Sequence, residues 1–116
     1  MDFYMKFMVS IHHRDDYDAA AHEDASVVKA IDDLNDEMIA AGVRQFAGGL
    51  HRAHTATSLR SSGDGNVIKT DGPYLPGEEH VAGFWILECA SMDEATEWGR
   101  KAVIACRAPV EVRQFH

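Results

Sequence analysis

The sequence predicts an α+β domain, and three observations lead to this class. Short apolar runs bounded by turn residues alternate with two segments of helical spacing, in the order strand, helix, strand, hairpin, strand, helix, strand. The chain has 116 residues, the size of one domain, and neither a repeat nor a linker divides it. Hydrophobic residues make up 46% and charged residues 26%, an ordinary globular mixture. We therefore expect residues 1–116 to form a single domain.

The first third of the chain predicts a strand followed by a helix. Residues 3–11 are rich in aromatic and β-branched side chains, which indicates a buried strand. The polar, alanine-rich stretch that follows predicts a loop leading into a helix, which Asp24 or Ser26 caps. Gly42 supplies the helix stop. Apolar residues in this helix recur every three or four positions and form one stripe: Val27, Val28, Ile31, Leu34, Met38 and Ile39.

The middle of the chain predicts a second strand and a hairpin. Residues 43–50 form the strand, and the pair Gly48-Gly49 within it suggests a bulge or a close backbone approach. Residues 55–60 and 66–70 are strands that flank a short loop with two glycines, which is typical of a hairpin.

The last third predicts a central strand, a helix and a final strand. Residues 81–89 are strongly apolar, so we place them in the centre of the sheet. Ser91 caps the helix, with Glu94 at the capping-box position, and the helix runs to about Cys106. Its apolar face consists of Ala95, Trp98, Ala102 and Val103. Residues 110–115 alternate apolar and polar side chains as a last strand.

This order of elements suggests a ferredoxin-like split β-α-β unit with an added β-hairpin, in which both helices cover one face of an antiparallel sheet. Large apolar groups point to both sides of the central strand, because Phe84 and Ile86 alternate with Trp85 and Leu87. One layer of helices covers only one side, and an exposed apolar face of this size usually marks a partner. A twofold homodimer, sheet on sheet, is the simplest solution.

Charge and cysteine content narrow the function classes. The net charge of −8 argues against nucleic acid and against an anionic membrane surface as partners. No signal peptide or membrane span is evident, so we expect a cytoplasmic protein. Cys89 and Cys106 each lie in apolar stretches and are expected to be reduced core residues. No phosphate-binding glycine loop or nucleophile elbow is present, and no cofactor is expected.

The run Thr70-Asp71-Gly72-Pro73-Tyr74 resembles the DGPF branch of the YCII-related family, whose run reads approximately T-D-G-P-F-x-E-x-K-E-x-x-G-G-F. Further similar motifs extend the resemblance over nearly the whole chain: Ala41-Gly42-Val43, Thr57-Ser58-Leu59-Arg60, Met92-Asp93-Glu94-Ala95 with Trp98, and Glu111-Val112-Arg113. The resemblance implies a ferredoxin-like fold and a dimer whose sheets face each other, as a dimeric α+β barrel. It implies no settled activity. An Asp/His pair facing a cleft has been proposed for such proteins, and an association with a sigma factor follows by family analogy only.

This sequence departs from the family pattern at three positions. Many relatives carry a helix histidine where this chain has Ile31. In the run after the DGPF motif, the first glutamate of the family is Pro76 here and the lysine is Glu78. An intact catalytic pair is therefore not carried over.

Candidate site residues gather around the DGPY motif. Asp71 ends a strand before a tight turn, where it either accepts hydrogen bonds from its own turn or acts as a base that orients a histidine. His80 is the tentative acid–base partner of Asp71. Arg60, Tyr74 and Glu79 are candidate ligand-binding residues, and a guanidinium such as that of Arg60 suits a small acid. The alternative for Arg60 is an ion pair within the chain, with Glu111 or Asp71.

Other histidines are weaker candidates. His51 and His54 lie three positions apart, so on an extended strand they would face opposite ways, and no metal site is expected. The run from His12 to Asp16 follows the first strand and is expected to be mostly solvated, with at most one of its histidines in a cleft.

Two functions remain open at this point. One is a dimeric module that binds a small molecule or a regulatory partner at a cleft near the DGPY motif, and the departures from the family pattern favour it. The other is an enzyme of isomerase, lyase or hydrolase type that uses an Asp/His acid–base pair.

Overall fold

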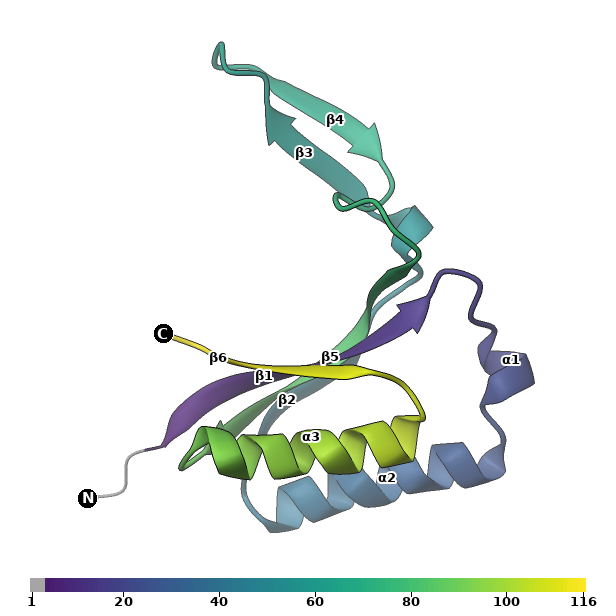
Figure 1. The fold of residues 1–116 in the computed structure, drawn as a ribbon, viewed down its shortest axis with the longest axis vertical. Helices are drawn as coiled ribbons and strands as arrows, with labels where there is room; N and C mark the ends of the chain where they lie inside the picture. The colour runs from purple at the N-terminus through teal and green to yellow at the C-terminus, as the bar shows by residue number, and fades with distance from the viewer. Residues whose placement is uncertain (1–3) are drawn as a thin grey trace.

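The computed structural model describes residues 4–116 and contains a four-stranded antiparallel sheet, two long helices and a separate two-stranded hairpin (Figure 1). The strand order of the larger sheet is β2-β5-β1-β6, and β3 pairs with β4. The elements are β1 (Met5–Arg14), α1 (Ala19–His22), α2 (Ala25–Ala40), β2 (Arg44–Gly49), η1 (Ala53–Thr55), β3 (Thr57–Ser61), β4 (Val67–Asp71), β5 (Glu79–Cys89), α3 (Met92–Cys106) and β6 (Val110–Gln114).

The α+β class and the order of the main elements are confirmed, with β5 and β1 in the centre of the sheet. The first strand, however, continues past Ile11 to Arg14 instead of ending before the polar run. It does so because β5 also starts earlier than expected, and Arg14 pairs with Glu79. The polar stretch after β1 also contains a short helix, α1. The predicted start of the first strand at residue 3 lies outside the described residues.

Both long helices begin at the predicted caps. The carboxylate of Asp24 accepts hydrogen bonds from the backbone N–H groups of Ser26 and Val27 at the start of α2. The hydroxyl of Ser91 accepts from the N–H of Glu94 at the start of α3. Gly42 follows α2 with a φ of +73°, the left-handed conformation that suits a helix end.

The apolar stripes of the helices are narrower than predicted. In α2, Val27, Leu34 and Met38 are buried, whereas Val28 and Ile39 are about half exposed. In α3, Val103 is also exposed. Each helix packs on the sheet along a single line, so residues one position off that line reach solvent.

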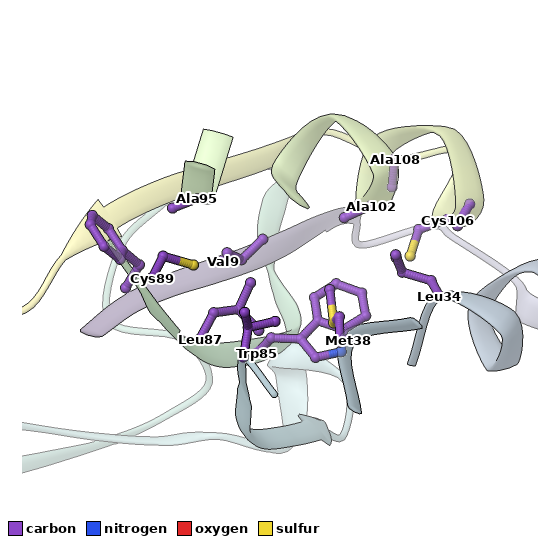
Figure 2. Close-up of a cluster of buried hydrophobic side chains, with 13 residues drawn as sticks. Val9, Leu34, Met38, Trp85, Leu87, Cys89, Ala95, Ala102, Cys106 and Ala108 are labelled. Atoms are coloured by element: carbon purple, nitrogen blue, oxygen red, sulfur yellow. The ribbon is translucent and has the colours of Figure 1, made fainter. Parts of the chain in front are cut away.

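The core lies between the two long helices and one face of the sheet (Figures 1 and 2). Phe7, Trp85 and Leu87 are at most 3% exposed. Gly83 of β5 lies so close to β2 that an added Cβ would come within 2.9 Å of the carbonyl oxygen of Gly48. The predicted close backbone approach at Gly48-Gly49 is thus present. Cys89 and Cys106 are buried free thiols, as expected, and burial raises the pKa of each to about 11.

The opposite face of the sheet, which we call the open face, carries the side chains that alternate with the core residues. Phe84 and Ile86 of β5 belong to it, together with Phe46 of β2 and Met8 of β1. Phe46 is 49% exposed, and its ring stacks on that of Phe84 with centroids 5.6 Å apart. Both long helices lie on the other side of the sheet (Figure 1).

The hairpin of β3 and β4, residues 57–71, projects from one end of the sheet, and we call it the arm (Figure 1). Its strands pair only with each other over five residue pairs, from Thr57–Asp71 to Ser61–Val67. Within residues 4–116, no helix combines the length and the apolar character that a membrane span requires.

Candidate functional site

A pocket of about 460 Å³ lies at the root of the arm, beside residues 50–54 and Pro73. The end of β1, the start of β5 and residues 50–54 form its walls, and Pro73 of the DGPY loop (residues 71–78) closes one side. Its polar lining is rich in imidazole groups and includes Arg14, Asp15, Tyr17, Glu23, His13, His51, Arg52, His54 and His80. We call this space the arm-base pocket.

His80 is fixed by hydrogen bonds at both ring nitrogens. Its Nδ1 lies 2.7 Å from the carboxylate of Asp15, and its Nε2 lies 3.1 Å from the carbonyl oxygen of Leu75. Carbonyl and ionised carboxylate oxygens only accept hydrogen bonds, so the doubly protonated ring is the form that satisfies both contacts. The hydrogen bond to Asp15 is the main cause that raises the pKa of His80, followed by the bond to Leu75. His80 therefore ties the DGPY loop to the end of β1.

This arrangement predicts the pH dependence of the loop. A histidine whose folded-state pKa is raised contributes stability that is complete below its unfolded value of about 6.5 and is lost as pH rises through the folded-state pKa. In an NMR titration of the histidine ring protons, His80 is expected to titrate above His13, and Asp15→Asn should lower the pKa of His80. Above the pKa of His80, the amide of Leu75 should exchange faster with solvent. An unchanged pKa of His80 in the Asp15 variant would contradict the arrangement.

His13 has the opposite electrostatic environment. Its ring stacks on Tyr17 with centroids 3.8 Å apart, and Tyr17 stacks in turn on His22 at 5.2 Å. Burial lowers the pKa of His13, and the nearby carboxylate of Glu23 offsets this only in part. The imidazole of His13 is consequently neutral at pH 7, so it can accept a proton from a group in the pocket.

Arg52 presents a positive charge to the same pocket. Its Nη2 donates to the backbone carbonyl oxygen of Tyr17 at 2.7 Å. Among residues 4–116, no carboxylate lies within ion-pair distance of Arg52. By contrast, the other arginine in the lining, Arg14, is paired with both Asp16 and Glu78. The charge of Arg52 is therefore available to a bound anion.

His51 and His54 line the arm-base pocket together, although a strand would have pointed them apart. Residues 51–54 do not form a strand, because His51 and Arg52 lie in an irregular segment that leads into η1, which contains His54. The prediction of opposite faces assumed an extended strand, which residues 51–54 do not form. Within residues 4–116, no three side chains of the metal-ligating types come together in a metal-binding arrangement.

Asp71 lies at the root of the arm, opposite Thr57 in the hairpin, and is exposed. Its neighbour Gly72 makes the local hydrogen bonds: the N–H of Gly72 donates to Ala56 at 2.7 Å, and its carbonyl accepts from the hydroxyl of Ser58 at 2.6 Å. The carboxylate of Asp71 makes no hydrogen bond within the described part of the chain. The partner that the structure gives to His80 is Asp15.

The predicted ligand-binding residues lie beside the pocket and not in its lining. The guanidinium of Arg60 stands over the ring of Tyr74, 5.0 Å from its centroid, and neither predicted ion-pair partner, Asp71 or Glu111, binds it among the described residues. Glu79 is exposed at the start of β5. The structure thus brings His80 to the pocket and leaves the other four predicted residues at its margin or on the arm. Their roles stay predictions.

A second pocket, of about 730 Å³, lies between α2 and the β2 edge of the sheet and shares His13, Glu23 and Ala82 with the first. Its polar centre is Asn35, whose side-chain oxygen accepts hydrogen bonds from the indole of Trp85 and from Arg44, both at 2.9 Å. Ile31, at the position where the family resemblance implies a histidine, lines this second pocket.

The sequence allowed one histidine of the run from His12 to Asp16 in a cleft, which is His13. It did not indicate Asp15, Tyr17 and Arg52 as its neighbours there. One signal was present, since Phe7, Val9 and Ile11 alternate along β1 and His13 continues that series on the same side of the strand. No sequence pattern indicated Arg52, because this residue lies directly before the η1 turn and not in a regular strand or helix.

Comparison with known proteins identifies the domain. The model of the YCII-related domain matches residues 5–115, which include the whole pocket lining and the arm. The chain belongs to the YCII-related family. An uncharacterized protein of Rhizobium meliloti (strain 1021) is 32% identical over 78 residues, which cover 67% of this chain and 62% of that protein. The chain therefore aligns with less than two thirds of the length of this relative. Because the YCII-related match spans both features, the arm-base pocket and the arm are parts of the family domain.

Proposed function

We propose that this YCII-related protein is a homodimer that binds a small organic anion in the arm-base pocket. The observation that carries this proposal is the Arg52 guanidinium, which faces the pocket without a carboxylate partner among residues 4–116. A guanidinium is suited to a carboxylate because its fork of N–H groups matches the two oxygens. The histidines beside it supply further hydrogen-bond donors, and the flat stack of His13 on Tyr17 offers a surface for an unsaturated or aromatic portion.

The finer structural predictions belong to the same proposal. The strand order β2-β5-β1-β6 with both long helices on one face supports a ferredoxin-like split β-α-β unit. The open face, with Phe46 and Phe84, supports the sheet-on-sheet homodimer of a dimeric α+β barrel. The run from Thr70 to Tyr74 supports the DGPF branch. A cytoplasmic location, the lack of nucleic-acid and membrane partners, and a sigma-factor association by family analogy stay predictions.

An enzyme is the second candidate function, and the neutral imidazole of His13 favours it. A general base needs a pKa near or below the working pH and a position that faces the substrate, and His13 meets both requirements. The other histidine, His80, has both ring nitrogens within hydrogen-bond distance of protein acceptors, so its role in this proposal is to position the loop. The acid–base pair first predicted from Asp71 and His80 would require these two residues to approach each other when a ligand binds.

Replacing Arg52 tests the binding function. In the wild-type protein, titration with benzoate and with succinate is expected to shift the NMR signals of pocket amides. Arg52→Ala should weaken this binding about tenfold or more, because a hydrogen bond to a charged group contributes about 1.5–3 kcal/mol. Arg100→Ala on the outer surface of α3, where Arg100 pairs with Glu97, serves as the control and should bind as the wild type does.

The variant Arg60→Ala distinguishes a ligand in the arm-base pocket from a ligand at Arg60, the binding residue that the sequence predicted. If Arg60→Ala abolishes binding while Arg52→Ala leaves it unchanged, the ligand lies on the arm and the assignment to the arm-base pocket falls. An absence of amide shifts with both anions at millimolar concentration would also count against the proposal. If one of the bound acids is turned over, His13→Gln should stop the reaction without preventing binding.

A further inference from the structure

The arm has almost no contact with the body of its own chain. Its two strands pair only with each other, and of residues 57–71 only Ser58 is buried. The apolar side chains of the arm are largely bare: Leu59 is 63% exposed, Val67 64% and Ile68 48%. An isolated two-stranded hairpin is only marginally stable in water, and three or more strands or a packed face are ordinarily needed. We therefore expect another protein surface to pack against the apolar side chains of this hairpin.

The base of the arm holds it away from its own sheet. Hydrogen bonds from Gly72 to Ala56 and from Ser58 to Gly72 connect the two ends of the hairpin at its root. The DGPY loop below it is tied to β1 through His80 and Leu75. Figure 1 shows the arm on the side of the sheet opposite to α2 and α3, standing clear of the open face. The arm and the rest of the chain therefore extend in different directions, and the molecule is broad and flat, with extents of 48 × 43 × 17 Å.

The single chain exposes more surface than a compact monomer of the same mass. The chain exposes 7977 Å², whereas a compact 12.8 kDa protein exposes about 6,300 Å², so the excess is about 1,700 Å². Its radius of gyration is 16.5 Å against about 13 Å for a compact chain of this length. Obligate homodimers bury about 1,000–2,500 Å² on each subunit. The excess has the size of one subunit's share of such an interface.

We propose that the arm is a clasp that lies on a second copy of this chain, with Leu59 and Val67 in the contact. Leu59 and Val67 lie on the same face of the hairpin, because the register pairs Leu59 with Lys69 and Val67 with Ser61. A second copy is the occupant that the geometry favours, because in a twofold dimer each arm finds the same surface on the other subunit and the assembly closes. This inference rests on the homodimer proposed above and adds a second area of contact to it. The sheet-on-sheet homodimer by itself needs only the open face.

Polar substitutions in the arm test the clasp. Both side chains are mostly exposed in the single chain, so the double variant L59N/V67N should fold as well as the wild type. Its dimer should dissociate at a concentration at least tenfold higher, measured by sedimentation velocity over a dilution series. Ile104→Asn is the matched control, because Ile104 is 77% exposed on α3, on the side away from the open face. It should leave the dissociation constant unchanged.

Amide hydrogen exchange gives a second readout where the dimer is too tight to dilute. The arm amides should be protected in the wild-type dimer and should exchange much faster in L59N/V67N, with the core amides of β1 and β5 unaffected. A wild-type dimer whose affinity and arm protection are the same in the double variant would overturn the clasp and leave the sheet-on-sheet dimer standing. A wild-type monomer at all concentrations would overturn both, and so would an arm protected in a monomer by its own sheet.

Discussion

Trp85→Ala is expected to lower the free energy of unfolding by about 3–5 kcal/mol, the largest loss for a single side chain in this protein. Trp85 lies in the middle of β5, is 3% exposed and belongs to the main hydrophobic cluster (Figure 2). Removing it leaves a cavity between the sheet and α2 that the surrounding backbone cannot close. Urea unfolding followed by circular dichroism measures the loss.

Two further variants separate packing from hydrogen bonding at this position. Trp85→Phe keeps much of the volume and removes the indole N–H that donates to Asn35, whose oxygen still accepts from Arg44. Trp85→Phe is expected to lower the free energy of unfolding by more than a substitution at an exposed site does, and by clearly less than Trp85→Ala does. Trp98→Ala on α3 is the control, since that residue is only partly buried. A loss below about 1 kcal/mol for Trp85→Ala would contradict the central role of this residue in the core.

Phe84→Glu is expected to convert the proposed homodimer into a monomer. In the register of the sheet, Phe84 lies opposite Ser10 on one side and Gly48 on the other, and its ring stacks on Phe46. If two open faces meet, a carboxylate at this position is buried without a partner, which costs several kcal/mol and raises the dissociation constant more than 100-fold.

Sedimentation velocity over a range of concentrations measures this effect. The control is Val103→Glu, which places the same charge on the exposed outer side of α3 and should not change the mass. Retention of the wild-type dimer by Phe84→Glu, in a protein that is folded by circular dichroism, would show that the open face is not the interface.

The sequence was sufficient for the elements whose signals are local. The caps at Asp24 and Ser91 and the stop at Gly42 each depend on residues a few positions apart, and all three are confirmed. The strong apolar run of β5 placed that strand in the centre of the sheet for a similar reason. The continuation of β1 through His12 and His13 was missed, because its cause is pairing with residues near position 80, and local polarity argued against a strand.

The candidate site depends on distant contacts, and sequence reasoning found only part of it. The DGPY motif drew attention to His80, which does lie in the pocket. Its partner could not be chosen from the sequence, since Asp15 is 65 residues away and nearby Asp71 has the same side chain. The presence of both His51 and His54 in the pocket lining depends on the irregular segment that leads into η1, which the sequence did not predict.

The mass of the wild-type protein in solution tests the central claim most directly, which is that a second copy covers the open face of the sheet. Size-exclusion chromatography with light scattering is expected to give about twice the chain mass of 12.8 kDa from micromolar concentrations upward. A single species of 12.8 kDa over that range, with Phe46 and Phe84 exposed to solvent, would contradict it.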